Sequence, residues 1–110
     1  MDANAIRDLF ETLGPVSIRR MFGGHGIYLH GRIFALEIGG EIYIKAGDEL
    51  ADRFREAGSR PFSYARNGKV ATMGYWLLPD AATDDPEEAA RWARLSLGAA
   101  ESPARKRRQA

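Results

Sequence analysis

Residues 19–34, RRMFGGHGIYLHGRIF, decide how the middle of this 110-residue chain folds. Three glycines fall within residues 23–26, GGHG, and strand-like apolar runs stand on both sides of them. A phosphate-binding loop needs its glycines to lead into a helix, whose aligned N–H groups hold the anion, and here they lead into IYLH. The stretch therefore predicts a tight turn or bulge between two strands, because glycine tolerates a positive φ.

Similar runs continue along the chain. VSIRRMF, GIYLH, RIFALEI and EIYIK are rich in β-branched and aromatic residues and predict four strands within residues 16–45. Two-residue joints, His30-Gly31 and Gly39-Gly40, predict tight antiparallel turns between them. Asn67-Gly68 predicts a further hairpin within residues 61–78.

Three segments show helical patterns instead. Residues 2–15 run from a capping Asp2 to a Gly-Pro stop, and residues 47–58 are amphipathic with Asp48 as the expected cap. A third helix is expected within residues 83–100, capped by Asp85, with Glu88 completing an Asp-x-x-Glu capping box. The expected buried faces are Ile6, Leu9, Phe10 and Leu13; Leu50, Phe54 and Ala57; and Ala89, Trp92, Ala93 and Ser96.

The order helix, four strands, helix, two strands, helix predicts an α+β fold with two layers, an antiparallel sheet and helices on one face. One domain is expected over residues 1–100, followed by a flexible basic tail over residues 101–110. Cysteine is absent, and no apolar run approaches the ~20 residues that a membrane span requires. Because the N-terminus also lacks the pattern of a signal peptide, a soluble cytoplasmic protein is expected.

The formal net charge of +1 is unevenly distributed. The tail carries four of the 16 basic residues, so residues 1–104 hold 12 basic against 15 acidic residues, a net charge of −3. Such a body is not a general polyanion binder. No acidic residue lies between Glu11 and Glu37, or between Glu56 and Asp80, so a mildly basic face could form where these two stretches meet.

Few residues suggest chemistry. His25 and His30 are five positions apart in an extended segment, which sends them to opposite faces, and no carboxylate lies in the same stretch. Turn and edge histidines are the better interpretation. No Gly-x-Ser-x-Gly elbow marks a nucleophile. We expect no catalytic residues, no metal and no cofactor, and predict that the protein is not an enzyme.

Alternation along the strands divides the side chains into two sets. One collects Ile18, Ile27, Leu29, Ile42 and Ile44, which suits a helix-covered core. The other set consists of side chains that have apolar bodies and polar or charged tips, which is typical of a surface that is half wet or shared with a partner. Its members are Arg19, Met21, Tyr28, Tyr43, Lys45, Met73 and Tyr75. This face is either a homodimer or partner interface, or is covered by a loop or by the third helix.

Two sets of residues follow as candidate contacts. The candidate protein-interaction residues are Arg19, Arg20, Met21, Tyr28, Tyr43, Lys45 and Tyr75, with Arg20 included although alternation places it beside Ile18. The candidate nucleic-acid contacts are Arg60, Arg66, Lys69, Arg105, Lys106, Arg107 and Arg108. The tail could bind phosphates, but no aromatic residue lies between its charges to stack on bases, so a merely solvated tail is the other interpretation.

Several blocks in order resemble the N-terminal domain of the TfoX/Sxy family of bacterial DNA-transformation competence regulators. The blocks are LGPVSIRRMFGGHGIYLHGRIFALEIGGEIYIK, GSRPFSYARNGKVATMGYWLLP and DPEEAARWARLSL. The resemblance implies a two-layer fold of the secretion-chaperone-like type, often dimeric, and a role in transcription regulation with partner proteins. It supplies no catalytic residues. Full-length regulators of this kind resemble two-domain proteins, and this chain is expected to be a stand-alone N-terminal form.

Overall fold

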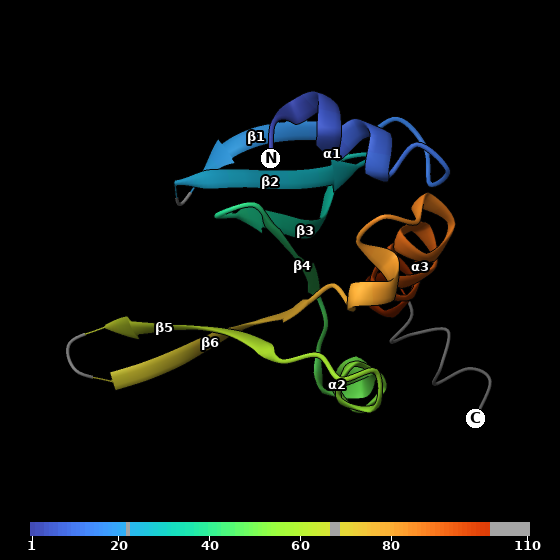
Figure 1. Cartoon of the computed structure of the whole chain (residues 1–110). Coiled ribbons are helices and arrows are strands. Elements are labelled where there is room, and N and C mark those ends of the chain that lie inside the picture. Colours follow the sequence, from blue (N-terminus) through green and yellow to red (C-terminus); the bar gives the residue numbers. More distant parts are fainter. Residues whose placement is uncertain (22, 67–68, 102–110) are drawn as a thin grey trace.

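The computed structural model describes residues 1–21, 23–66 and 69–101, of which 64–66, 69–73 and 99–101 are described for the backbone only. Its elements are α1 (Ala3–Leu9), β1 (Ser17–Met21), β2 (Gly24–Leu29), β3 (Arg32–Ile38), β4 (Glu41–Lys45), α2 (Asp48–Glu56), β5 (Pro61–Arg66), β6 (Lys69–Leu77), the 3₁₀ turn η1 (Asp80–Ala82) and α3 (Pro86–Glu101). The strands form one antiparallel sheet in the order β1-β2-β3-β4-β6-β5 (Figure 1). The predicted α+β class and element order are confirmed.

The three α-helices contribute to one apolar core on one face of the sheet. Phe10 from the end of α1 meets Phe34 edge to face at 5.1 Å, and Phe54 of α2 packs against Trp92 of α3 at 4.4 Å between ring centroids. The strand residues beneath them include Ile27 and other fully buried aliphatic side chains. None of the described helices is long and apolar enough to cross a bilayer.

Positive φ angles confirm the tight turns between the central strands. His30 and Gly31 have φ of 50° and 83°, and Gly39 and Gly40 have φ of 62° and 87°, as primed two-residue turns require. Asn67-Gly68 lies outside the described residues. The pairing of Arg66 with Lys69 nevertheless confirms the third hairpin.

The glycine-rich stretch is a turn followed by a strand, so the expected bend over residues 23–26 is too broad. Gly24 and Gly26 lie inside β2, and only Gly23, with φ of 75°, belongs to the turn that follows β1. Gly24 is needed for close approach, because a Cβ there would overlap the carbonyl oxygen of Glu37 on β3. The glycines here allow the tight turn and the close approach of β2 and β3, and they do not lead into a helix as in a phosphate-binding loop.

Two details of the first two helices differ from expectation. α1 ends at Leu9, but further turns keep Phe10 buried and Leu13 packed on the core. The N-cap of α2 is Gly47, so Asp48 is a first-turn residue whose charge favours the helix N-terminus. The buried face of α2 includes Ala51, while Ala57 lies past its end and is exposed.

α3 begins as predicted but without the full capping box. The Asp85 carboxylate accepts hydrogen bonds from the backbone N–H groups of Glu87 and Glu88, at 3.0 and 3.4 Å. The N–H of Asp85 donates to the carbonyl of Ala82, and the Glu88 side chain lies 3.4 Å from Arg91 instead. The predicted stripe of the helix is confirmed, with Ala89, Ala93 and Ser96 buried and Trp92 packed against the core.

Candidate interaction face

The second face of the sheet carries an apolar cluster to which none of the described helices contributes. Its buried members come from three strands: Leu36, Tyr43 and Tyr75. Partly buried side chains pack around them: Met21, Ile33, Ile38, Phe62 and Leu77. We call this surface the helix-free face.

A bulge shifts the alternation of side chains within β3. Ile27 pairs with Ala35 and Tyr28 pairs with Ile33, so Phe34 is an extra residue in the ladder. Phe34 and Ala35 therefore both join the helix-covered core, while Ile33 joins the helix-free face. Simple alternation along RIFALEI cannot yield this arrangement.

The structure corrects the expectation of a half-wet face at two of its tyrosines, Tyr43 and Tyr75, whereas Tyr28 is partly exposed as expected. Tyr43 and Tyr75 are only 9% and 7% exposed within the single chain. Tyr43 meets Phe62 of β5 edge to face at 4.9 Å, and its hydroxyl donates to the Glu41 carboxylate at 3.1 Å. Burial, and then the hydrogen bond and charge of Glu41, raise the pKa of Tyr43.

The helix-free face brings together tyrosines from strands that are not adjacent in the sheet. Strands β3 and β4 lie between β2 and β6, yet Tyr28 of β2 is close enough to Tyr75 of β6 to affect its ionisation. Burial mainly, and the neighbouring Tyr28 hydroxyl to a lesser extent, raise the pKa of Tyr75. Among the described residues, side chains of neighbouring strands bury these rings.

The rim of the helix-free face keeps the accessible side chains. The Arg19 guanidinium lies over the Tyr28 ring at 5.6 Å from its centroid, within cation–π range. Met21 and Tyr28 are half-buried, whereas Arg19 and Lys45 are exposed. The predicted interaction residues therefore separate into a buried centre and a partly basic rim.

The structure does not gather the predicted nucleic-acid residues into one site. Arg60 is exposed and lies 3.7 Å from the Glu41 carboxylate, which offsets its charge. Arg66 and Lys69 face each other as register partners at the end of the β5–β6 hairpin, and their side chains lie outside those described. The tail, residues 105–108, also lies outside the described residues.

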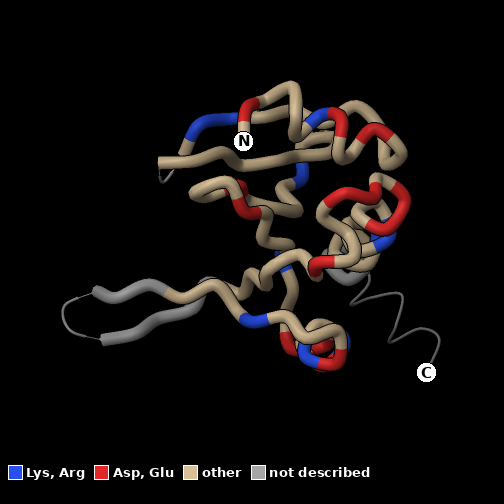
Figure 2. Tube along the Cα trace, viewed as in Figure 1, with Lys and Arg blue, Asp and Glu red and all other residues tan. Residues whose placement is uncertain are grey.

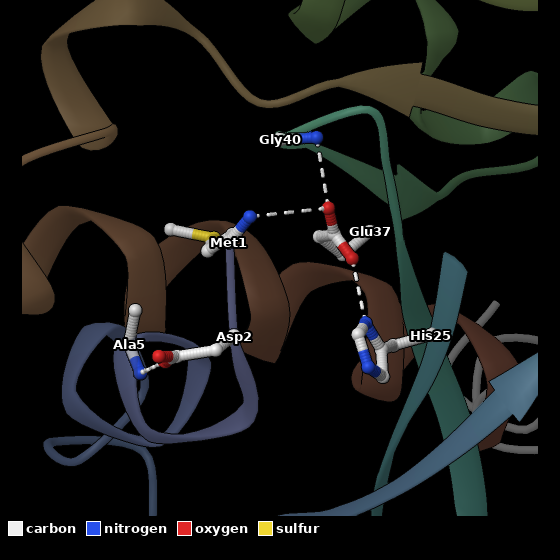
Figure 3. A network of polar contacts seen from close by, with 6 residues as sticks. All are labelled: Met1, Asp2, Ala5, His25, Glu37 and Gly40. Carbon is white, nitrogen blue, oxygen red and sulfur yellow. Dashed lines mark hydrogen bonds and ion pairs between the residues drawn. The ribbon is translucent and has the colours of Figure 1, made fainter. Parts of the chain in front are cut away.

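A buried carboxylate that the sequence did not reveal lies on the helix-covered side. Glu37 is 4% exposed; His25 Nδ1 donates to it at 2.6 Å, the Gly40 N–H donates at 2.8 Å, and the Met1 amine lies 3.7 Å away (Figure 3). Burial alone would raise the pKa of Glu37, but the His25 and Gly40 hydrogen bonds and the nearby positive charges outweigh it, so this pKa is lowered. Arg20 is the register partner of His25, which places it on this side, as alternation indicates.

Glu37 was missed because its partner is twelve positions away, on the neighbouring strand. The available signal was a single acidic residue at a core-facing position of RIFALEI. A buried carboxylate there must receive hydrogen bonds from neighbouring groups. The pair resembles half of a metal site. However, the described residues contain no group of three or more His, Cys, Asp or Glu that could hold a metal ion.

Comparison with known protein families shows to which family the chain belongs. The TfoX N-terminal domain matches residues 8–100, which include every described strand, α2 and nearly all of α3, but only the last two residues of α1. The chain belongs to the TfoX N-terminal domain family.

Two relatives of this chain carry the names DNA transformation protein TfoX1 and Protein Sxy. The DNA transformation protein TfoX1 of Aliivibrio fischeri is 34% identical over 66 residues, covering 60% of this chain and 32% of the relative. Protein Sxy of Escherichia coli is 24% identical over 94 residues, covering 86% of this chain and 45% of the relative. The chain thus spans less than half the length of either relative. The sheet and its two faces lie within the TfoX N-terminal domain match.

Proposed function

We propose that this chain is a regulatory domain of the competence-regulator type, which acts through protein contacts in transcription control and not through catalysis. The observation that carries the proposal is the family match over residues 8–100, together with a relative named for DNA transformation. The second apolar cluster supports it, because an apolar face with a polar rim suits a partner better than a substrate held by convergent polar groups.

The helix-free face is the proposed homodimer surface. Its partly buried apolar side chains, such as Ile38 and Leu77, would lose their remaining exposure against a second copy. The surroundings carry both signs of charge, with Arg19 and Lys45 against Glu41. A two-fold axis can therefore bring opposite charges together, which favours self-association.

Light scattering over a dilution series tests the homodimer. We expect a dimer that Lys45→Glu weakens about tenfold or more, since an interfacial charge is reversed. Arg53→Glu, an exposed position of α2 on the other side of the sheet, is the matched control. A monomer at every concentration, or equal effects of both variants, contradicts the proposed surface.

The regulatory role is tested by deleting the gene in its native host and measuring transformation frequency and the transcripts of DNA-uptake genes. Both should fall and be restored by the unaltered chain, with less restoration by the Lys45→Glu variant. Unchanged transformation and transcripts in the deletion strain contradict a role in competence, whatever the oligomeric state.

Accessory DNA binding is a second candidate, favoured by the register pair Arg66–Lys69. Like charges directly opposite each other destabilise a strand pair, and a bound phosphate would relieve this. A mobility-shift series at low salt, with the intact chain, an Arg66→Gln/Lys69→Gln variant and a truncation after Pro103, tests it. DNA binding that is unchanged by both changes would show that neither the Arg66–Lys69 pair nor the tail contributes to it.

A further inference from the structure

The two free edges of the sheet differ in their capacity to accept another strand. The sheet order leaves β1 and β5 at the edges. β5 begins with Pro61, which has no N–H to donate, and its register shifts between Pro61 and Ser63. β1 has neither proline nor a register shift over its five pairs with β2. The edge formed by β1 is therefore the better template for strand addition.

Two adjacent arginines mark this edge. Both Arg19 and Arg20 are exposed, and alternation sends them to opposite faces, Arg19 over Tyr28 and Arg20 beside its register partner His25. Neither forms an ion pair with any residue that the structure describes. Three other exposed arginines are paired with carboxylates, Arg55 with Asp52, Arg60 with Glu41, and Arg91 with Glu88. Arg7 and Arg53 are also exposed without a described ion pair, but they lie on helices and not at a strand edge.

We propose that the free edge of β1 binds an extended acidic segment of a partner protein by β-strand addition. The backbone groups of β1 would supply the ladder hydrogen bonds. Because Arg19 and Arg20 project to opposite faces, two consecutive acidic residues of the added strand, which also project to opposite faces, would each meet one guanidinium. The recognised feature is thus an acidic dipeptide within a β-prone segment.

A second copy of this chain fits the edge poorly. Antiparallel pairing of two β1 strands would bring four guanidinium groups together, which disfavours the pair. The acidic run of the chain, residues 84–88, leads into α3, where Asp85 caps the helix, so it is not extended. Figure 2 shows this acidic segment well away from the basic part of β1.

Nucleic acid is also a weaker fit than an acidic strand. Residues 1–104 carry a net charge of −3, which repels a long polyanion. A strand edge presents alternating donors and acceptors, and a peptide backbone matches both, whereas phosphates can only accept. The inference rests on the proposed protein-interaction role, but it concerns the free edge of β1, which shares Arg19 with the rim of the proposed homodimer face.

Defined peptides test the edge directly. The probe is a labelled ten-residue peptide of Thr and Val with a central Glu-Glu pair, and the controls carry Gln-Gln or Lys-Lys there. We expect fluorescence anisotropy at low salt to detect the Glu-Glu peptide, with at least about tenfold weaker binding by Arg19→Glu/Arg20→Glu. That variant should instead bind the Lys-Lys peptide. Arg7→Glu/Arg53→Glu makes the same change in net charge on α1 and α2 and should behave as the unaltered chain.

Two N-methylated versions of the Glu-Glu peptide test backbone pairing. One is methylated at the alternate residues whose N–H groups would face β1, and the other at the residues in between. One of the two should lose binding, and amide chemical shifts should change in β1 and not in β5 when the unmodified peptide binds. Equal binding by both methylated peptides, no effect of the double arginine reversal, or tighter binding of duplex DNA at the same arginines would each overturn the inference. Because the peptide assay needs neither dimer nor host, its failure is distinguishable from failure of the proposed function.

Discussion

The two faces of the sheet bury aromatic and aliphatic side chains in different ways. On the helix-covered face, rings such as Phe34 and Trp76 are enclosed by elements from another layer. On the helix-free face, Tyr43 and Tyr75 reach nearly the same burial, and the described residues that pack on them come from strands alone. Cross-strand packing can therefore bury a second small cluster, and it leaves Arg19 and Lys45 exposed beside that cluster.

The largest effect is expected on the helix-covered face. Phe34→Ala removes a fully buried ring that packs on Phe10, and should lower the free energy of unfolding by about 3–5 kcal/mol. Urea denaturation followed by circular dichroism measures this. A loss below about 1 kcal/mol would mean that the helices do not enclose this ring.

A substitution in the sheet itself should disturb both faces. Gly24→Ala places a methyl group into the Glu37 carbonyl and should cost about 3 kcal/mol or more, because two backbones must separate. Gly23→Ala is the matched control: nothing lies near its Cβ, and only the positive φ costs about 1–2 kcal/mol. Similar losses at both positions would show that close strand approach is not the cause.

Leu36→Ala measures the strength of the helix-free cluster. Leu36 is 1% exposed, and its truncation should cost about 2–3 kcal/mol, less than Phe34→Ala. The same urea titration applies. A loss equal to that of Phe34→Ala would remove the energetic difference between the faces, and a negligible loss would show that the strand neighbours do not bury this side chain.

The smallest expected effect concerns Glu37 and depends on pH. Glu37→Gln weakens the His25 and Gly40 hydrogen bonds and should cost about 1–2 kcal/mol at pH 7. Because the folded-state pKa of Glu37 is lowered, its stabilising contribution is complete above the ordinary glutamate pKa of about 4.3 and is lost as the pH falls through the folded pKa.

The check is the difference in unfolding free energy between the unaltered chain and the variant, measured from pH 7 down to pH 3. It should shrink towards acid pH. Glu56→Gln, an exposed position of α2, should change stability by less than about 0.5 kcal/mol throughout. A difference that grows towards acid pH contradicts the lowered pKa.

Much of the fold could be predicted because its signals are local. The joints at His30-Gly31 and Gly39-Gly40 and the caps at Asp2 and Asp85 involve residues only a few positions apart, and all four were found where predicted. Period-two alternation placed Met21, Tyr43 and Tyr75 on one side of the sheet, and the structure packs them in one cluster. The degree of burial of Tyr43 and Tyr75 could not be predicted, since it depends on contacts between strands that are distant in the sequence.

The sequence by itself determined the element order, the tight turns and the division of strand residues into two sets, because each follows from propensity, φ requirements or spacing within a short segment. Only the tertiary structure decided three further matters: the bulge at Phe34, the His25–Glu37 pair, and the enclosure of Tyr43 and Tyr75. Each depends on which distant segments become neighbours and on how closely they approach. Those are collective properties of the packed sheet, and no local pattern encodes them.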